Sequence, residues 1–334
     1  MASFMEQIYE KAKKSPKKVV LPEGNDPRTV EAAAKATALG VAKIAMIGNP
    51  AKIQELAAAG KFDLSGVEII DEINLPSIES FAKEFYELRK AKGMTEAEAL
   101  ETMKKPVYYA GMMVRRGLAD TFVAGAVYTT AEVSRAAIYL IGMKEGIKTL
   151  SSFFVMILPD KSFGKDGVLF YSDGGFVIDP SDEQLADIAV TTGDTYRSLM
   201  GEEPNIAMLS FSTKGSAKHA RIDKVTRALD IAKKKDPTLK IDGELQADAA
   251  LIPAVGAKKA PGSDVAGKAT VLIFPDLDSA NIAYKLTERL ARAEAYGPIY
   301  QGTAKPCSDL SRGCKANDIV NVAAINVVRL QISK

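Results

Sequence analysis

Near the end of the chain, a short segment brings together side chains that could act on a charged substrate. Ser311, Arg312 and Asp318 follow a loop rich in glycine and proline and precede an apolar stretch that predicts a helix at about 317–330. An arginine fork matches the oxygens of a phosphate group, and a serine hydroxyl can donate to an oxyanion. An aspartate in the first helical turn is favoured in its ionised form, which can accept a proton from a nucleophile such as a thiol. The segment predicts an anion site with a base beside it, or alternatively a helix-capping cluster with a surface arginine.

Two further arginines are candidates for binding phosphate. Arg135 follows the turn of small residues at 125–130, which joins a predicted strand to a predicted helix. In open α/β sheets, ligands bind at the carboxyl ends of strands, where helix N-termini direct N–H groups toward anions. Arg89 ends a predicted helix, where a basic residue is common. For both arginines the alternative is a solvated side chain. The loop at 211–218 could also hold an anion, although a polar turn and a helix start explain it equally well.

Several kinds of catalytic site are excluded by residue types that are rare in this chain. Zinc centres of the HExxH type need more than the single histidine, His219, and a Ser-His-Asp hydrolase would have to pass every proton through it. Cys307 and Cys314 lack a second ligand pair, so we interpret them as ordinary small side chains. The segment at 262–268 is close to a P-loop, but Ala269 replaces the required hydroxyl and the apolar strand follows the loop instead of preceding it. We therefore expect chemistry by carboxylates, hydroxyls, basic side chains and backbone amides, with no metal.

Composition indicates a soluble globular protein with no nucleic-acid or membrane partner. The 334 residues are 47% apolar and 26% charged, and 44 Lys+Arg against 42 Asp+Glu leave a formal charge of +2. A dedicated nucleic-acid binder needs a concentrated basic excess. The longest apolar runs, near 136–143 and 153–159, are far shorter than the roughly 18 residues of a membrane-spanning helix. With no apolar signal segment at the N-terminus and only two cysteines, we expect a cytoplasmic location.

Alternating strands and helices predict the scaffold that must position these residues. In the first part of the chain, strands are predicted at 18–21, 43–47, 67–70 and 121–124, with helices at 29–39, 77–90, 95–103 and 107–116. In the second part, a predicted hairpin of segments 149–158 and 167–172 precedes the helix 182–200, the strand 206–209, the helix 217–235, the strand 269–274 and the helix 279–294. Such alternation predicts right-handed βαβ units and mainly parallel sheets.

The length predicts two domains, at about 150 residues each. The texture of the sequence changes near Lys148, so we place the second domain at 149–290. The tail after Tyr296 is too short to fold alone. We therefore assign 1–148 and 291–334 together to the first domain.

Several motifs, taken in order, resemble those of the phosphate acetyltransferase (phosphotransacetylase) family. The matching segments are spread over essentially the whole chain: 22–29 (PEGNDPRT), 85–93, the turn near 125, 209–218, 242–250, 259–286, 293–302 and 309–318. No single segment is diagnostic, whereas the ordered set is. The resemblance implies two α/β/α domains with a cleft between them, similar to the isocitrate and isopropylmalate dehydrogenase architecture, and usually a homodimer.

The resemblance also implies a reaction and a role for each candidate residue. Family members transfer an acetyl group reversibly between acetyl phosphate and coenzyme A, by direct attack of the thiolate in a ternary complex and without a metal or nucleotide cofactor. On the matching motif, Ser311 and Arg312 would orient the acyl phosphate and stabilise charge on the tetrahedral transition state. Asp318 would be the base that takes the thiol proton of coenzyme A. Arg89 and Arg135 would bind phosphates of the substrates.

Two positions depart from the family pattern. Tyr128 stands where many members have histidine, and Ala136 where many have proline. Both lie beside the expected acyl-phosphate pocket, so the range of acyl chains stays open. The alternatives are a phosphate butyryltransferase with a larger acyl pocket and a non-catalytic module that binds acetyl-CoA. A metal-dependent decarboxylating dehydrogenase would need an acidic metal cluster and a nicotinamide site, and the sequence shows neither.

Overall fold

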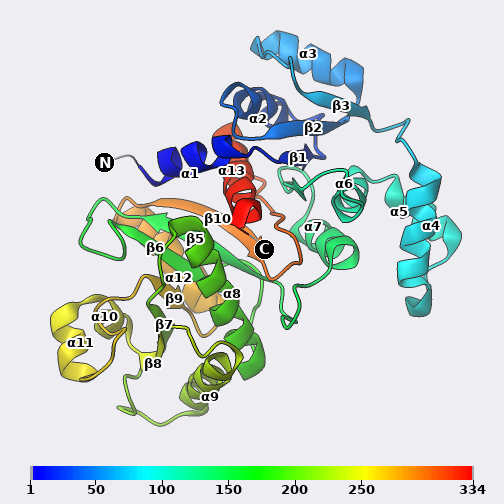
Figure 1. Ribbon diagram of the computed structural model, residues 1–334. Coiled ribbons are helices and arrows are strands. Elements are labelled where there is room, and N and C mark those ends of the chain that lie inside the picture. The colour runs from blue at the N-terminus through cyan, green and yellow to red at the C-terminus, as the bar shows by residue number, and fades with distance from the viewer. Residues whose placement is uncertain (1–2, 333–334) are drawn as a thin grey trace. The chain divides into compact units, whose positions relative to one another are not determined.

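The computed structural model describes residues 3–332 and divides the chain into two compact units (Figure 1). One unit comprises the described residues up to Gly142 together with those from Thr303 onward, and the other comprises Met143–Gly302. The second unit includes β10 (Glu294–Gln301), which the sequence had placed with the first domain. This strand pairs antiparallel with β5 (Ser151–Ile157), so it belongs to the second sheet.

The first unit contains a four-stranded parallel sheet in the order β3-β2-β1-β4. Its strands are β1 (Lys18–Leu21), β2 (Lys43–Gly48), β3 (Glu68–Asp71) and β4 (Thr121–Phe122). Its helices are α1 (Phe4–Lys14), α2 (Pro27–Ala38), α3 (Pro50–Gly60), α4 (Ile78–Arg89), α5 (Glu96–Met103), α6 (Pro106–Arg115), α7 (Thr130–Ala136) and α13 (Ala316–Ile332), with a π-helical turn, η2 (Ala137–Ile141). The predicted strands and the parallel arrangement are confirmed.

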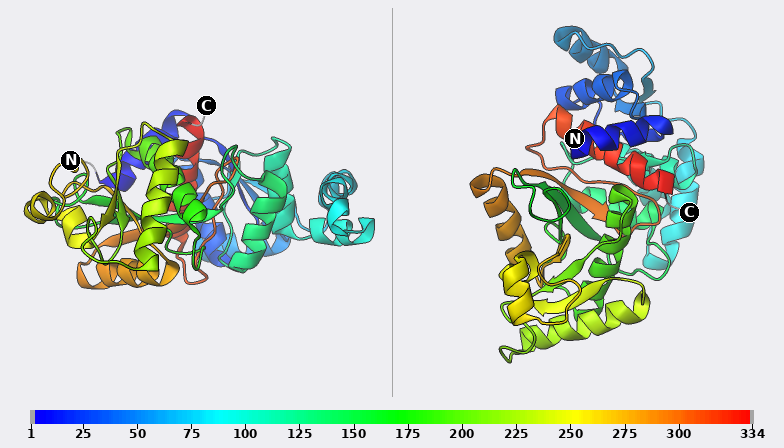
Figure 2. Two further views of the ribbon diagram at one scale, coloured as in Figure 1. Left: turned by 90° about the horizontal axis from the view of Figure 1, so that it is seen from below. Right: turned by 60° about the vertical axis from the view of Figure 1, so that its left-hand side comes forward.

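Two sets of contacts attach the C-terminal segment to the rest of the first unit. Helix α13 lies beside α1, since Tyr9 donates to Asn321 and Gln331 donates to the carbonyl of Ala12, and Figure 2 shows the two helices side by side. Strand β4 is short because the chain beyond it pairs with the segment before α13 through a parallel bridge between Val123 and Ser308. The C-terminal segment therefore continues the sheet edge next to β4.

The second unit contains a mixed six-stranded sheet in the order β10-β5-β6-β9-β7-β8. Besides β5 and β10, its strands are β6 (Val168–Ser172), β7 (Ile206–Leu209), β8 (Ile241–Leu245) and β9 (Val271–Ile273). Its helices are α8 (Asp182–Met200), α9 (Ala220–Lys235), α10 (Ala247–Leu251), α11 (Pro253–Lys259) and α12 (Leu277–Leu290). Strands β5 and β6 form the predicted antiparallel hairpin, while β6, β9, β7 and β8 run parallel.

Alternating side chains of the second sheet bury its two faces under different helices. Phe170 of β6 packs edge-on against Tyr196 of α8, and α8 packs against α9 on this face. Phe154 of β5 points to the other face, where its ring stacks on Tyr284 of α12 with the centroids 4.0 Å apart. Each unit is thus an α/β sheet covered by helices, as predicted. Among the described residues, no helix is both long and apolar enough to cross a membrane.

Candidate functional site

A buried carboxylate organises the turn that follows β4. Glu23 lies just beyond β1, the neighbour of β4 in the sheet, and is only 7% exposed. Its two oxygens accept hydrogen bonds of 2.8–3.1 Å from four consecutive backbone N–H groups, those of Gly125, Ala126, Val127 and Tyr128. Consecutive N–H groups of this kind form an anion-binding concavity. The sequence predicted that this turn directs N–H groups toward an anion, and in the structure that anion is the chain's own Glu23.

The turn and the C-terminal loop touch at Gly125. A Cβ atom at this position would lie 2.2 Å from Oδ1 of Asp309 and 2.5 Å from the backbone nitrogen of Leu310. The φ angle of Gly125 is +112°, which L side chains rarely adopt. Glycine is therefore required here, because the backbone of the loop packs directly against it.

The guanidinium of Arg28 fastens three segments to one another. Two of its N–H groups bind the carboxylate of Asp26, at 2.9 and 2.7 Å. The other three bind the backbone carbonyls of Ala126 (2.9 Å), Arg312 (2.7 Å) and Cys314 (3.1 Å). Arginine has five such donors, so every one is used. Asp26 also caps α2, whose first residue is Pro27, so the clamp is built on a well-defined helix start.

Ser311 and Arg312 lie in one turn of the chain, and Asp318 lies in the helical turn that follows it. The carbonyl of Ser311 accepts from the N–H of Cys314 at 2.8 Å, which closes the turn. Asp318 lies in the first turn of α13, and its Oδ2 accepts from the N–H of Lys315 at 2.8 Å. Asp318 therefore caps its helix, as the alternative interpretation predicted, while its Oδ1 has no hydrogen-bond partner among the described residues.

The side chain of Arg312 stands free while its backbone is held. The residue is exposed, and its guanidinium forms no hydrogen bond or ion pair with any residue between 3 and 332. A guanidinium whose donors are all open, on a backbone that is held in place, can bind an anion bidentately. The arrangement of this loop is therefore suited to a phosphate or an acyl phosphate.

Asp309 is a second buried carboxylate beside this loop, and sequence analysis assigned it no role. It is 2% exposed, and its Oδ1 has no hydrogen-bond partner among the described residues. Burial raises the pKa of Asp309 to about 6, while its hydrogen bond with Thr130 and the charge of Arg312 act in the opposite direction. The negative charge of Glu23 adds to the increase. Asp309 thus changes its charge within the physiological range.

Arg89 and Arg135 belong to a second group, in which Arg89 contacts Tyr139 of η2 while Arg135 and Tyr139 both act on the hydroxyl of Tyr108. The guanidinium carbon of Arg89 lies 3.8 Å from the centroid of the Tyr139 ring, and its buried Nε has no hydrogen-bond partner among the described residues. Burial raises the pKa of Tyr108, and the charge of Arg135 opposes that increase, so Arg135 lies near this hydroxyl. Among the described residues, no hydrogen bond or ion pair joins this group to the loop of Ser311 and Arg312.

The remaining candidate residues have structural roles. Tyr128 is largely buried, which raises its pKa, and its hydroxyl bonds the backbone of Val107. Burial raises the pKa of Cys307 to about 12 and that of Cys314 to about 11, so neither thiol is prepared to act as a nucleophile. In the loop at 211–218, the N–H of Gly215 binds the carboxylate of Glu244 at 2.8 Å. This loop is a polar turn satisfied from within the chain, as the alternative predicted.

Sequence analysis missed three residues that build the site, namely Glu23, Arg28 and Asp309. Glu23 and Arg28 stand in the motif PEGNDPRT at 22–29, which contributed only to the family resemblance. Apart from Asp26, which binds Arg28, their partners are backbone groups about a hundred or more positions away, so no local spacing reveals the contacts that build the site. The signal available was a charged residue directly after a predicted strand.

Comparisons with known proteins cover nearly the whole chain. The sequence model of the family described as phosphate acetyl/butaryl transferase matches residues 3–327. A phosphate acetyltransferase of Acetivibrio thermocellus is 52% identical over 99% of both chains. A phosphotransacetylase structure from Streptococcus pyogenes superposes with a TM-score of 0.93 at 39% identity, over the full length of both chains. At the level of fold alone, a 4-hydroxythreonine-4-phosphate dehydrogenase from Burkholderia phymatum is similar, with a TM-score of 0.55 at 11% identity over 94% of this chain and 98% of that one.

Replacing Arg28 tests the clamp. Arg28→Lys keeps the charge but offers three donors instead of five, so backbone contacts to the loop are lost. We expect Tm to fall by about 5–10 °C and the amide hydrogens of 311–316 to exchange faster. Arg116→Lys is the control, because Arg116 is exposed, pairs with Glu84 and lies over the ring of Phe81, away from the loop at 311–316. Unchanged exchange at 311–316 in Arg28→Lys would contradict the clamp.

Asp309 predicts a pH-dependent contribution to stability. The folded protein binds its proton more tightly than the unfolded chain, so this contribution decreases as the pH rises from about 4 to about 6 and stays low above that. Asp309→Asn removes the titration, and we expect the variant to gain up to about 3 kcal/mol relative to the parent between pH 4 and pH 7.5. Urea unfolding at both pH values measures the difference. A difference independent of pH would show that Asp309 ionises normally.

Proposed function

The chain belongs to the phosphate acetyl/butaryl transferase family, and on that basis we propose that it transfers an acetyl group reversibly between acetyl phosphate and coenzyme A. The observation that carries the assignment to a particular site is the Ser311–Arg312 turn. Its backbone is fixed by the clamp of Arg28, and the guanidinium of Arg312 is left open for an anion.

In the proposed reaction, the thiolate of coenzyme A attacks the carbonyl carbon of acetyl phosphate. A bond forms between the sulfur and the carbonyl carbon. The bond between that carbon and the oxygen that bridges to phosphorus breaks, and inorganic phosphate leaves. Arg312 pairs with the phosphate, and the Ser311 hydroxyl donates to the oxyanion of the tetrahedral intermediate. Orientation of the two substrates can lower the barrier by about 7–11 kcal/mol at most, and a placed donor by about 3–4 kcal/mol.

Asp318 is the proposed base for the thiol proton. The hydrogen bond from Lys315 to Oδ2 holds the carboxylate in place, and Oδ1 is left to accept a proton. A carboxylate is a weak base, but a thiol with an ordinary pKa of about 8.5 is acidic enough for it, whereas an alcohol is not. The chain needs no catalytic histidine for such a reaction.

Arg89 and Arg135 are proposed to bind substrate phosphates, at least one of them on coenzyme A. The buried and unpartnered Nε of Arg89 supports this, because a polar atom in such a position normally has a partner. The guanidinium of Arg89 lies against the ring of Tyr139, and such a contact limits the positions that the guanidinium can take when it binds phosphate.

We propose further that the enzyme works as a cytoplasmic homodimer without a metal or nucleotide cofactor, as the family resemblance implies. The free cysteines Cys307 and Cys314 are consistent with a reducing compartment. We propose that residue 128 influences the range of acyl chains, because the neutral hydroxyl of Tyr128 stands where many family members have an ionisable imidazole. The relative rates with acetyl phosphate and butyryl phosphate distinguish a phosphate acetyltransferase from a phosphate butyryltransferase.

Arg312→Ala tests the phosphate-binding role. We expect kcat to fall about 100- to 1,000-fold with Tm unchanged, because the side chain contacts substrate and no described residue of the chain. The assay is thiol-dependent acyl transfer from acetyl phosphate, with a chelator present. Arg116→Ala serves as the exposed-arginine control. Turnover like that of the parent would refute the role of Arg312.

Asp318→Asn tests the base. The amide oxygen can still accept from Lys315, so the helix cap and coenzyme A affinity should survive, while kcat near neutral pH falls about 100-fold or more. Above the pKa of the thiol the nucleophile ionises without help, so the defect should shrink as the pH rises. A pH profile parallel to that of the parent would remove Asp318 as the base.

A further inference from the structure

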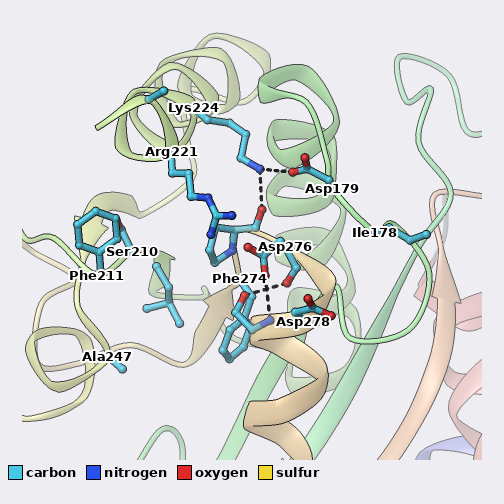
Figure 3. A pocket seen from close by; sticks show the side chains of 14 residues that line it. Ile178, Asp179, Ser210, Phe211, Arg221, Lys224, Ala247, Phe274, Asp276 and Asp278 are labelled. Atoms are coloured by element: carbon cyan, nitrogen blue, oxygen red, sulfur yellow. Dashed lines mark hydrogen bonds and ion pairs between the residues drawn. The ribbon is translucent and has the colours of Figure 1, made fainter. Parts of the chain in front are cut away.

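The second unit contains a cavity of about 640 Å³ that the proposed reaction does not use (Figure 3). It lies at the carboxyl ends of parallel strands. Phe211 follows β7, Phe274 follows β9, and Arg221 and Lys224 come from the start of α9. Asp276 and Asp278 stand at the start of α12. The volume is in the range of pockets that hold small organic ligands.

The cavity occupies the point where the sheet changes its winding direction. Strands β7 and β9 are neighbours in the sheet. The chain leaves β7 for α9, which packs with α8 on one face, and leaves β9 for α12, which packs on Phe154 on the other face. In open α/β sheets this divergence opens a crevice between the strand ends, and ligands bind there. Topology and cavity thus point to the same place.

The two helices that border the cavity give it opposite charges at its two sides. Arg221 is exposed and forms no side-chain hydrogen bond or ion pair with any residue between 3 and 332. Beside it, Lys224 binds Asp179 at 2.8 Å and the carbonyl of Pro275 at 2.9 Å. At the other helix, Asp276 already caps α12 and Asp278 is an exposed acceptor without a partner among the described residues. An anionic group of the ligand therefore belongs on the α9 side, and hydrogen-bond donors on the α12 side.

Phe211 lies on the opposite side of the cavity from Asp278, as Figure 3 shows. The ring of Phe211 makes a T-shaped contact with the ring of His219, with the centroids 6.3 Å apart. Phe211 is nevertheless 59% exposed, so much of its ring surface is available to a flat ligand. Nucleobases stack favourably on exposed aromatic side chains. Phe274 and Leu209, both buried, supply further apolar surface.

We propose that this cavity binds an adenine nucleotide. The base stacks on Phe211, its amino group donates to Asp278, and its phosphate lies at Arg221 and Lys224. This site is additional to the loop of Ser311 and Arg312. Two sources carry the same chemistry, a free nucleotide such as AMP and the nucleotide end of coenzyme A.

Binding of AMP to the full chain, measured by isothermal titration calorimetry, tests the proposal without any reference to catalysis. We expect saturable binding that weakens about tenfold or more in Arg221→Gln and in Phe211→Ala. Arg227→Gln is the matched control, because Arg227 lies on the same helix, outside the cavity, and pairs with Asp182. IMP, which lacks the amino group, should bind less tightly than AMP, and Asp278→Ala should abolish that preference.

Competition distinguishes the two sources. If coenzyme A displaces AMP and Arg221→Gln raises the KM for coenzyme A, the occupant is the nucleotide end of the substrate. If AMP binding is lost in Arg221→Gln while that KM is unchanged, the occupant is a free nucleotide. Absence of AMP binding, or binding equally tight in the Arg221 and Phe211 variants, overturns the proposal. Because binding is read directly, such a failure leaves the proposed acetyl transfer untouched.

Discussion

The guanidinium of Arg28 is the contact on which the first unit's site depends. Three of its five N–H groups bind backbone carbonyls, two in the C-terminal loop and one in the turn after β4. Because backbone rather than side chains is held, the loop is fixed without consuming Arg312. The carboxylate of Glu23 performs the matching task for the turn, where four N–H groups converge on it. Rigid backbone and an open side chain are what preorganised anion binding requires.

In each unit, a glutamate carboxylate accepts hydrogen bonds from backbone N–H groups of a loop that follows a strand. In the first, Glu23 fills the N–H groups after β4, and in the second, Glu244 accepts from Gly215 in the loop after β7. Loops that would attract phosphate in other α/β proteins are therefore already neutralised by the chain. In the two sites that we propose, the anion is bound instead by the side chains of Arg312 and Arg221. This explains why glycine-rich phosphate-binding motifs are missing from a protein whose proposed substrates carry phosphate.

Local patterns predicted the strands of the first unit and the loop of Ser311, Arg312 and Asp318, since hydrophobic runs and helix starts are encoded by neighbouring residues. The sequence could not show that β10 joins the second sheet, because its partner β5 lies far away in the chain and pairs antiparallel. It also missed Glu23 and Arg28, whose partners are backbone groups that any residue could supply. Asp309 was overlooked for a related reason: its significance comes from burial, which depends on the turn at Gly125.

The second unit is inserted into the first, which is completed only by the segment from Thr303 onward. During synthesis, the whole of Met143–Gly302 leaves the ribosome before α13 and the loop ahead of it exist. The inserted unit can therefore form its sheet before α13, the last helix of the first unit, has been synthesised. A nascent chain that stops before residue 311 lacks Arg312 and two of the three backbone carbonyls that Arg28 binds, so the anion site of the first unit can form only after the segment from Thr303 onward has been synthesised.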